Sequence, residues 1–200
     1  MNNTQPLEEK EQHEDGFFGK FDHYKGIIYF AVILIVAHFL WKFLITGDES
    51  DTMVTLLGID ISAPFRFMVR HIALVCNKVI NFFGFGSILR YGNNIWFPDV
   101  QTGIRIVWGC TAIKQSYIFI CIIAFYRGSW KNKLWYVPAG LIVIYLFNIL
   151  RICIIAIVTK YYHEWFYFTH EIFLKLVFYF VIFMMWVLWE EKFSKIKKIN

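Results

Sequence analysis

Charged residues are scarce in this sequence: they make up 18% of it, whereas about 25% is usual for a soluble protein. Hydrophobic residues make up 58% and aromatic residues 20%, and they gather in long runs. A surface in contact with water does not tolerate such runs, whereas a lipid bilayer requires them. The composition therefore excludes an ordinary soluble protein and predicts an integral membrane protein with one domain.

Paired cysteines and metal-binding motifs are also missing. The four cysteines form no CxxC pair and lie in or beside apolar segments, so we expect no structural disulfides. The His-Glu pairs at 163–164 and 170–171 lack the second histidine of a helical zinc site. We therefore expect no metal and no cofactor. The sequence also lacks the Gly-x-Ser-x-Gly motif and the paired glutamates within a span that characterise two classes of intramembrane protease.

The net charge of +5 does not predict nucleic-acid binding, because the basic residues flank or interrupt apolar runs and form no solvated basic face. Residues 1–25 are polar and carry six acids. They lack the basic start and the small-residue cleavage site of a secretory signal peptide. We expect them to form a cytoplasmic tail, followed by a first helix that is retained.

Four apolar runs are long enough to cross a bilayer, which takes about 20 helical residues at ~1.5 Å each. The predicted spans are 26–45, 104–126, 134–158 and 166–189. Tryptophans near the ends of these runs fit interfacial anchors: Trp108, Trp130, Trp135, Trp165 and Trp189. The predicted fold is all-α, a polytopic membrane helical bundle. It has one transmembrane domain over 26–191 and a basic cytoplasmic tail over 192–200.

Residues 65–89 differ from these runs. Arg66, Arg70, Asn77 and Asn81 fall on one narrow helical face, and apolar residues occupy the rest. That pattern is typical of an amphipathic helix in the membrane interface, or of a half-buried helix packed against the bundle.

The distribution of basic residues predicts the orientation of the spans. Residues 46–64 contain no Lys or Arg, whereas the loop between the second and third spans has three basic residues and the C-terminal tail has four lysines. Cytoplasmic loops carry the excess of positive charge. We therefore expect four spans with both termini in the cytoplasm, and residues 46–103 outside, with the helix at 65–89 on the outer surface.

This topology brings three polar side chains of the membrane region to a similar depth. Cys110, Arg151 and His170 lie about six, seven and four residues inside the outer ends of their predicted spans. At ~1.5 Å per residue, all three fall roughly 6–11 Å below the outer surface. We expect them to form one site that faces outward.

Each of these side chains also has a simpler interpretation. A charge inside an apolar run costs a few kcal/mol and usually marks function, but Arg151 would also fit a snorkelling residue or a partner of Glu171. Cys110 alone would fit a small hydrophobe, and His170 a hydrogen-bonded residue at a helix start. Two neighbours favour a site: Lys114, about one turn after Cys110, would favour a thiolate, and Asn148 lies one turn before Arg151.

The order of these residues resembles that of the exosortase/archaeosortase family. The resemblance covers roughly residues 100–190, and its elements are Gly109-Cys110-Thr111-Ala112-Ile113, then Asn148-Ile149-Leu150-Arg151-Ile152, then His170. Many members have Cys-Ser/Thr-Gly, where this chain has Ala112 in place of the glycine. The chain also lacks several helices of the larger members, which indicates a compact branch.

The resemblance implies a cysteine protease or transpeptidase that acts on peptide bonds of exported proteins. Cys110 would be the nucleophile, His170 the general base and acid, and Arg151 the group that stabilises the oxyanion, with Asn148 and Lys114 in support. The implied substrates carry a C-terminal motif, an apolar helix and a basic end. The implied location is the cytoplasmic (inner) membrane, where the lipid bilayer surrounds a multi-pass protein whose active site faces the outer, periplasmic side.

Two interpretations without catalysis stay open. In one, Arg151, Lys114 and His170 line a polar pathway in a small transporter component. In the other, the chain is a membrane assembly factor that binds another membrane protein through its aromatic faces. The first predicts no special role for Cys110, and the second predicts that all three polar residues are replaceable.

Overall fold

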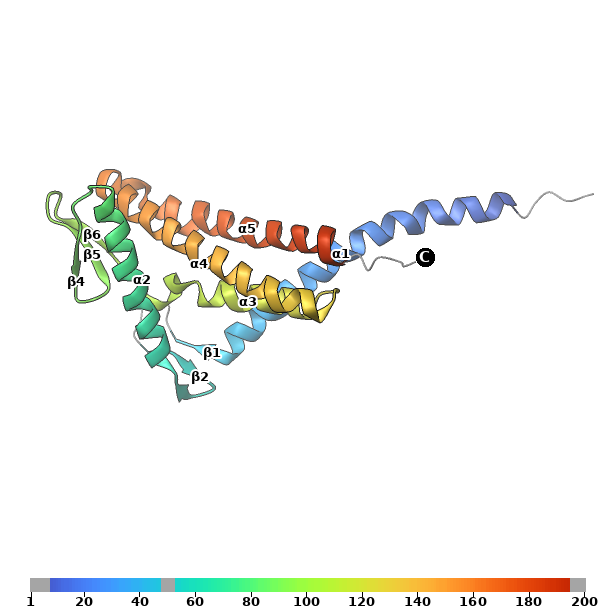
Figure 1. Cartoon of the computed structure of the whole chain (residues 1–200), viewed down its shortest axis with the longest axis horizontal. Helices are drawn as coiled ribbons and strands as arrows, with labels where there is room; N and C mark the ends of the chain where they lie inside the picture. The colour runs from blue at the N-terminus through green and yellow to red at the C-terminus, as the bar shows by residue number, and fades with distance from the viewer. Residues whose placement is uncertain (1–7, 48–52, 195–200) are drawn as a thin grey trace, which may run out of the picture.

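The computed structural model describes residues 8–47 and 53–194, and it is mostly helical (Figure 1). The helices are α1 Glu8–Leu44, α2 Ser62–Phe82, α3 Ile113–Phe125, α4 Trp130–Tyr161 and α5 Leu174–Trp189. Short 3₁₀ and π-helical segments lie before and after these helices: η1 Trp108–Thr111, η2 His163–Trp165, η3 Phe168–Phe173 and η4 Glu190–Ser194. The strands are β1 Ile45–Thr46, β2 Thr55–Leu56, β3 Ile59–Asp60, β4 Ile88–Arg90, β5 Asn94–Phe97 and β6 Thr102–Arg105.

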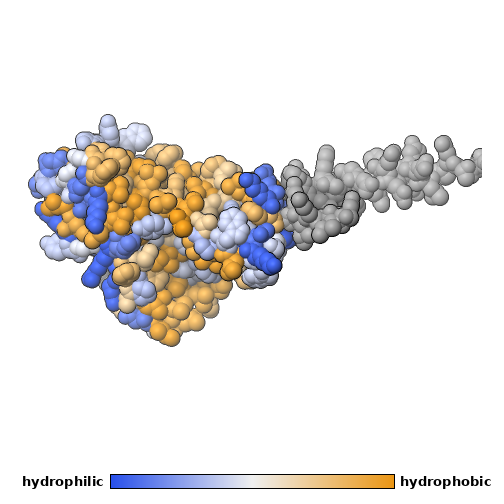
Figure 2. All heavy atoms as spheres, in the orientation of Figure 1, coloured by the Kyte–Doolittle hydropathy of each residue, from blue (hydrophilic) through white to orange (hydrophobic). Residues whose placement is uncertain are grey.

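Among the described residues, three helices are long and apolar enough to cross a bilayer, and α3 is a shorter apolar helix of 13 residues. The three are Lys25–Leu44, Trp130–Tyr161 and Phe168–Phe193. Figure 2 shows the corresponding apolar surface in the middle of the molecule, with hydrophilic surface at the end that carries β4–β6. The predicted polytopic helical membrane fold is thus confirmed.

The predicted span 104–126 is wrong in its first half. Residues Thr102–Arg105 form strand β6, residues 108–111 form a 3₁₀ turn, and the helix begins only at Ile113. The 13 residues of α3 rise about 20 Å, which is less than the ~30 Å of a hydrocarbon core. The strand fits the sequence, because the β-branched residues Thr102, Ile104 and Ile106 alternate with Gly103 and Arg105.

Helix α2 has the amphipathic character expected for 65–89, although it ends at Phe82. Its buried side chains lie on one stripe: Phe65, Val69, Ile72, Ala73, Cys76 and Ile80. The two asparagines of the predicted polar face bind the residues that follow the helix. Asn81 exchanges hydrogen bonds of 2.7 and 2.8 Å with the backbone of Ser87, whose hydroxyl donates to Asn77. The asparagines therefore have a structural role, which leaves Arg66 and Arg70 as the charged part of that face.

Two antiparallel sheets were not predicted. The first has the order β1-β2-β3 and follows α1 directly, and the second has the order β4-β5-β6 with β6 at its edge. In the second sheet, Ile95 pairs with Ile104, and both side chains are buried. Gly103 is required there, because a Cβ at this position would collide with the backbone of Ile95. This sheet places residues 103–106 beside α4.

The buried side chains form two hydrophobic clusters. One joins α2, the second sheet and the second half of α4, and the other joins α1, α3, α5 and the first half of α4. Within the second cluster, α3 packs closely on α4 because Gly140 has no Cβ, which would collide with the ring of Phe119. Small residues allow this close approach in membrane bundles. Residues 108–112 lie between the two clusters and contribute to both.

The ends of the bundle differ in chemistry. In Figure 1, α2 and β4–β6 lie at one end, while the α3–α4 turn and the C-terminal end of α5 lie at the other. The α3–α4 turn is tied down there, since Trp189 donates to the carbonyl of Arg127 and the Lys133 ammonium donates to the carbonyls of Ala124 and Tyr126. Lys133, one of the three basic residues between the second and third predicted spans, thus caps the C-terminal end of α3. Part of the predicted basic tail, 195–200, lies outside the described residues.

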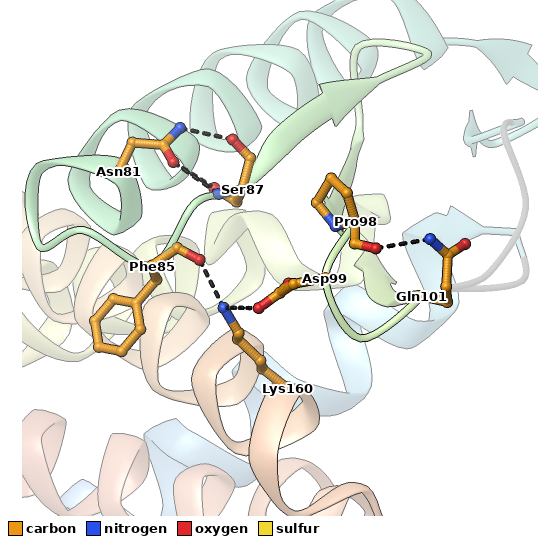
Figure 3. A network of polar contacts seen from close by, with 7 residues as sticks. All are labelled: Asn81, Phe85, Ser87, Pro98, Asp99, Gln101 and Lys160. Carbon is orange, nitrogen blue, oxygen red and sulfur yellow. Dashed lines mark hydrogen bonds and ion pairs between the residues drawn. The ribbon is translucent and has the colours of Figure 1, made fainter.

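A buried lysine fixes the end of α4 to the second sheet (Figure 3). Lys160 Nζ lies 2.7 Å from Asp99 Oδ2 and donates to the carbonyl of Phe85 over 2.7 Å. Its side chain is 6% exposed, whereas that of Asp99 is 55% exposed. Asp99 lies in the β5–β6 turn and Phe85 in the connection from α2 to β4. One ammonium therefore holds three elements together.

The Asp99 contact predicts a dependence of stability on pH. The hydrogen bond from Lys160 holds the pKa of the Asp99 carboxyl below its ordinary value. The stabilisation is therefore complete above the pKa of the unfolded chain, about 3.9, and is lost as the pH falls through the lower folded value. We expect the midpoint of thermal unfolding to fall more steeply below about pH 4 in the normal chain than in Asp99→Asn. Equal slopes in detergent-solubilised protein would contradict this prediction.

Candidate functional site

Cys110 lies on a 3₁₀ turn between the second sheet and α3, where a transmembrane helix had been predicted. Its backbone N–H donates to the carbonyl of Val107 over 3.0 Å, and the hydroxyl of Thr111 donates to the carbonyl of Trp108 over 2.6 Å. These bonds close the turn on itself. A side chain on such a turn is held more rigidly than one on an open loop, which suits a reactive group.

Ala112 joins this turn to α3 in the left-handed conformation, with φ 58° and ψ 16°. Glycine adopts this conformation without strain, whereas an L-residue is disfavoured by about 1–2 kcal/mol. The backbone at Ala112 thus favours glycine, which is the residue expected at this position from the family resemblance described above. The Ala112 side chain is 3% exposed.

This conformation predicts how Ala112 responds to substitution. In Ala112→Gly, strain relief is offset by the loss of a buried methyl group and a more flexible unfolded chain, so we expect stability to change by less than about 1 kcal/mol. In Ala112→Val, a β-branched side chain meets the left-handed region, and we expect a loss of more than about 2 kcal/mol. Thermal unfolding of the two purified variants measures the difference. A glycine variant that is less stable than the valine variant would contradict the assignment.

Asn148 connects α4 to the Cys110 turn. Its Nδ2 donates to the backbone carbonyl of Cys110 over 2.9 Å, and its side chain is 1% exposed. A buried amide that binds a backbone carbonyl fixes the distance between the two elements, because breaking the bond leaves polar groups unsatisfied. The structure thus places Asn148 against Cys110, which sequence spacing did not reveal.

Arg151 lies on α4 one turn after Asn148 and is 3% exposed. Its guanidinium carbon is 5.9 Å from the ring centroid of Phe178 on α5, a cation–π contact. The side chain is buried within the bundle, so it does not snorkel to the surface. The side chain of Glu171, the simpler partner considered for Arg151, lies outside the described part of the chain.

His170 lies on the π-helical segment η3, just before α5. Its ring stacks on that of Phe166, with the centroids 5.4 Å apart and the planes 7° from parallel. π-helical turns are rare and are frequently found at functional sites. The stacking holds the imidazole in one orientation.

Cys110 and His170 line the same cavity, which has a volume of about 200 Å³. Its other walls come from β6 and the residues after it, from one face of α4, and from the segment before α5: Gly103, Ile104, Arg105, Ile106, Ile152, Ile155, Thr159 and Phe166. The cavity brings together three stretches of the chain: residues 103–110, residues 152–159 of α4, and residues 166–170. A mostly apolar wall with a few polar groups is typical of a binding site.

The residues that line this cavity in the described part of the chain do not include Arg151 or Lys114. Arg151 is adjacent in sequence to Ile152, a wall residue, and its guanidinium faces Phe178 of α5. Lys114 lies at the start of α3, where its charge acts on His38 of α1. The structure thus brings Cys110, His170 and Asn148 together, places Arg151 on α4 between Asn148 and the wall residue Ile152, and places Lys114 towards α1.

The other cysteines lie elsewhere. Cys76 and Cys153 are buried where α2 meets α4, with the Cys153 sulfur 4.0 Å from the carbonyl oxygen of Cys76. Cys121 is on α3, three turns from Cys110, in the second cluster. The β6 wall was missed because residues 104–107 were assigned to a helix. The alternation of β-branched residues there is the signal that indicates a strand.

Comparison with known proteins adds a family. The family model described as transmembrane exosortase (Exosortase_EpsH) matches residues 51–187. This match includes α2, the second sheet, the Cys110 turn, α3, α4 and most of α5. No curated protein and no solved structure matches the chain.

Proposed function

The chain belongs to the transmembrane exosortase family, and from this membership we propose that it is a membrane-embedded cysteine protease or transpeptidase. Its substrates would be exported proteins, each with a C-terminal motif, an apolar helix and a basic end. It would cleave them at the outer face of the cytoplasmic membrane. A family of this kind implies cysteine transpeptidase chemistry in general, and the local chemistry of this chain supports particular roles.

One observation carries the proposal: a thiol and an imidazole from distant parts of the chain share one cavity. A cysteine nucleophile needs a base that accepts its proton, and histidine is the side chain that most often does so near neutral pH. The other cysteines do not line this cavity: Cys76 and Cys153 lie in the contact between α2 and α4, and Cys121 packs against the second hydrophobic cluster. Cys110 is therefore the thiol that we assign as nucleophile, and His170 is the base.

In the proposed reaction, His170 takes the thiol proton as Cys110 Sγ bonds to a peptide carbonyl carbon. The carbonyl oxygen becomes an oxyanion, and Arg151 stabilises its charge. The tetrahedral intermediate then collapses: its C–N bond breaks, and His170 returns the proton to the departing amine. A thioester to Cys110 remains. Water or an acceptor amine attacks it next, which releases an acid or a new amide and restores the thiol.

The proposed orientation rests on the two ends of the bundle. The basic α3–α4 turn and the end of α5 lie together, as expected for a cytoplasmic side, and the Cys110 turn packs against α2, at the end with the second sheet. A substrate helix would cross the membrane beside the bundle with its basic end inside. Its outer end would then reach the level of Cys110.

A comparison of exported proteins tests the proposal. Mass spectrometry of C-terminal peptides from cells with the chain and cells without it should show a set of proteins that lose their apolar tails only when the chain is present. Re-expression of the chain should restore this loss. Identical C-termini in both strains, while the protein is detected in the membrane, would contradict the proposal and favour a transporter component or an assembly factor.

A further inference from the structure

Cys76 and Cys153 are 77 residues apart in sequence, and the fold brings their side chains together where α2 packs on α4. The two thiols interact with each other directly. The Cys153 sulfur lies 4.0 Å from the carbonyl oxygen of Cys76, and the Cys76 sulfur lies 3.9 Å from the carbonyl oxygen of Ile149. In an α-helix that oxygen accepts from the backbone N–H four residues later, which is that of Cys153. Each sulfur therefore lies against the backbone of the other cysteine or beside it.

This cysteine pair is enclosed by the first hydrophobic cluster. Cys76 is 0% exposed and Cys153 is 6% exposed, and both are free thiols in the structure. A disulfide needs two sulfurs that can approach to about 2.05 Å from neighbouring backbones. Two thiols that already meet across a helix–helix contact satisfy this requirement. The sequence predicted no such bond, because two cysteines in distant apolar segments carry no pairing signal.

We propose that Cys76 and Cys153 form a disulfide bond that joins α2 to α4 on the outer side of the membrane. Disulfides form and persist in oxidising compartments such as the bacterial periplasm. Helix α2 lies at the end of the bundle with the second sheet, which is the end assigned to the outside. The inference thus rests on the orientation in the proposed function and is independent of the catalytic roles.

The disulfide would leave the proposed nucleophile as a separate thiol. In the described part of the chain, no other cysteine lines the cavity that Cys110 shares with His170. Cys121 interacts with Tyr117 of its own helix. A cysteine nucleophile acts as the thiolate, so in an oxidising compartment it has to avoid disulfide formation. The geometry therefore assigns the bond to the two cysteines that the reaction does not use.

The bond would also support the turn that carries Cys110, because α2 and α4 hold this turn from two sides. From α2, the ring of Phe65 contacts that of Trp108 edge-on, with the centroids 5.6 Å apart. From α4, Asn148 donates to the carbonyl of Cys110 over 2.9 Å. A covalent link between the two helices limits their separation, and with it the movement of the turn between them.

The oxidation requires a disulfide donor R–S–S–R, which a thiol–disulfide oxidoreductase of the outer compartment supplies. The Cys76 thiolate attacks one donor sulfur, the donor S–S bond breaks, and a mixed disulfide to Cys76 forms as one R–S⁻ leaves. The Cys153 thiolate then attacks the Cys76 sulfur and displaces the second R–S⁻. The two cysteines are oxidised, the donor is reduced, and the two thiol protons end on the two R–SH groups. The Cys76 thiol is accessible to the donor before α2 docks on α4.

Peptide mapping without reductant tests the proposal. The full chain is produced in a bacterial host with an oxidising periplasm, and its membranes are dissolved in SDS with N-ethylmaleimide, which traps free thiols. After digestion with trypsin, Cys76 lies in peptide 71–78 and Cys153 in peptide 152–160. We expect mass spectrometry to find most of these two peptides joined, at the sum of their masses less two hydrogens, and reduction should separate them. Reaction of both cysteines with N-ethylmaleimide before reduction would overturn the proposal.

The other cysteines supply controls for this measurement. Cys121, in peptide 115–127, should react with N-ethylmaleimide in every sample, which shows that the reagent reaches helices of the bundle. In Cys76→Ala the joined peptides should disappear and Cys153 should become alkylated. In Cys110→Ala the joined peptides should persist. A parent chain in which Cys110 is linked to Cys76 or Cys153 would overturn the proposal.

Thermal unfolding measures what the bond contributes. A disulfide that closes a long loop stabilises a protein mainly by restricting its unfolded chain. In detergent, a reductant should lower the unfolding midpoint of the parent by about 5–15 °C. It should leave unchanged the midpoint of the double variant Cys76→Ala, Cys153→Ala. Equal responses of the two proteins would overturn the proposal that a disulfide ties α2 to α4.

Neither readout depends on catalysis. Loss of apolar tails in cells where Cys76 and Cys153 are both alkylated would retain the proposed function and refute this inference. A joined peptide pair in cells that show no such processing would support this inference and refute the proposed function.

Discussion

Replacing Cys110 with alanine should leave every substrate of the chain with its apolar C-terminal tail. Without a thiol no thioester forms, and removal of an enzyme's nucleophile lowers the rate by about 10³-fold or more. Folding should be unaffected, because the turn is held by backbone bonds and by the Asn148 bond to the Cys110 carbonyl, all of which alanine retains. Mass spectrometry of exported proteins, together with the amount of variant in the membrane, measures both effects.

Two other cysteines provide matched controls for this result. Cys121→Ala removes a thiol from α3 within the second cluster, and Cys153→Ala removes one from the contact of α4 with α2. Each replacement removes some packing contacts, but neither side chain lines the cavity, so both variants should still remove the apolar tails. Full processing by Cys110→Ala would show that the thiol is structural. Loss of tail removal in all three variants would indicate a general defect of folding.

The long helices were predictable from sequence because a membrane imposes a simple rule. About 20 apolar residues in succession have one stable conformation in lipid, with all backbone polar groups paired inside the segment. The regions 26–45, 134–158 and 166–189 obey it, and long helices lie there. Residues 104–112 satisfied the hydropathy criterion as well, but residues 104 and 105 pair with β5 of the second sheet, and residues 108–111 form a 3₁₀ turn before α3 begins.

The candidate functional residues were likewise predictable only in part. The charge of Arg151 within an apolar run could be recognised without coordinates, since burying it is costly in any fold. The sequence also predicted that Cys110 and His170 share a site, but not its walls, because β6, α4 and η3 contribute to them and β6 had been assigned to a helix. The depth argument matched the residues by counting along helices, yet Cys110 precedes its helix. Its position follows from the turn and from Asn148 instead.

The polar face of α2 illustrates what periodicity leaves unresolved. Arg66, Arg70, Asn77 and Asn81 share one helical face, and spacing alone gives them one role. The structure divides them: the asparagines bind Ser87 after the helix, and the arginines line a cavity. The difference depends on residues 87–93 and 105–108, which approach different turns of α2. Only the tertiary fold determines that approach.

Arg151 is the position where charge and geometry can be separated. In Arg151→Gln the stabilisation of the oxyanion is lost, and we expect processing to fall by about 10²–10³-fold. In Arg151→Lys the charge remains while the planar fork is lost, so we expect a fall of about tenfold to a hundredfold. The rate is measured as the fraction of one substrate, identified by the comparison of exported proteins, that is processed per unit time. The amounts of membrane-inserted protein are kept equal.

A purely structural arginine would give a different pattern. Phe178→Leu removes the aromatic ring beside the guanidinium and leaves Arg151 in place, at a cost of about 1–2 kcal/mol in stability. If Arg151 acts on the oxyanion, Phe178→Leu should lose stability but retain most of its rate, and Arg151→Gln should lose rate by far more than its unfolding midpoint explains. If Arg151 acts only through packing, the rates of Phe178→Leu, Arg151→Lys and Arg151→Gln should follow their stabilities. Because Arg151 lies one turn after Asn148, whose amide binds the Cys110 carbonyl, we expect the first pattern.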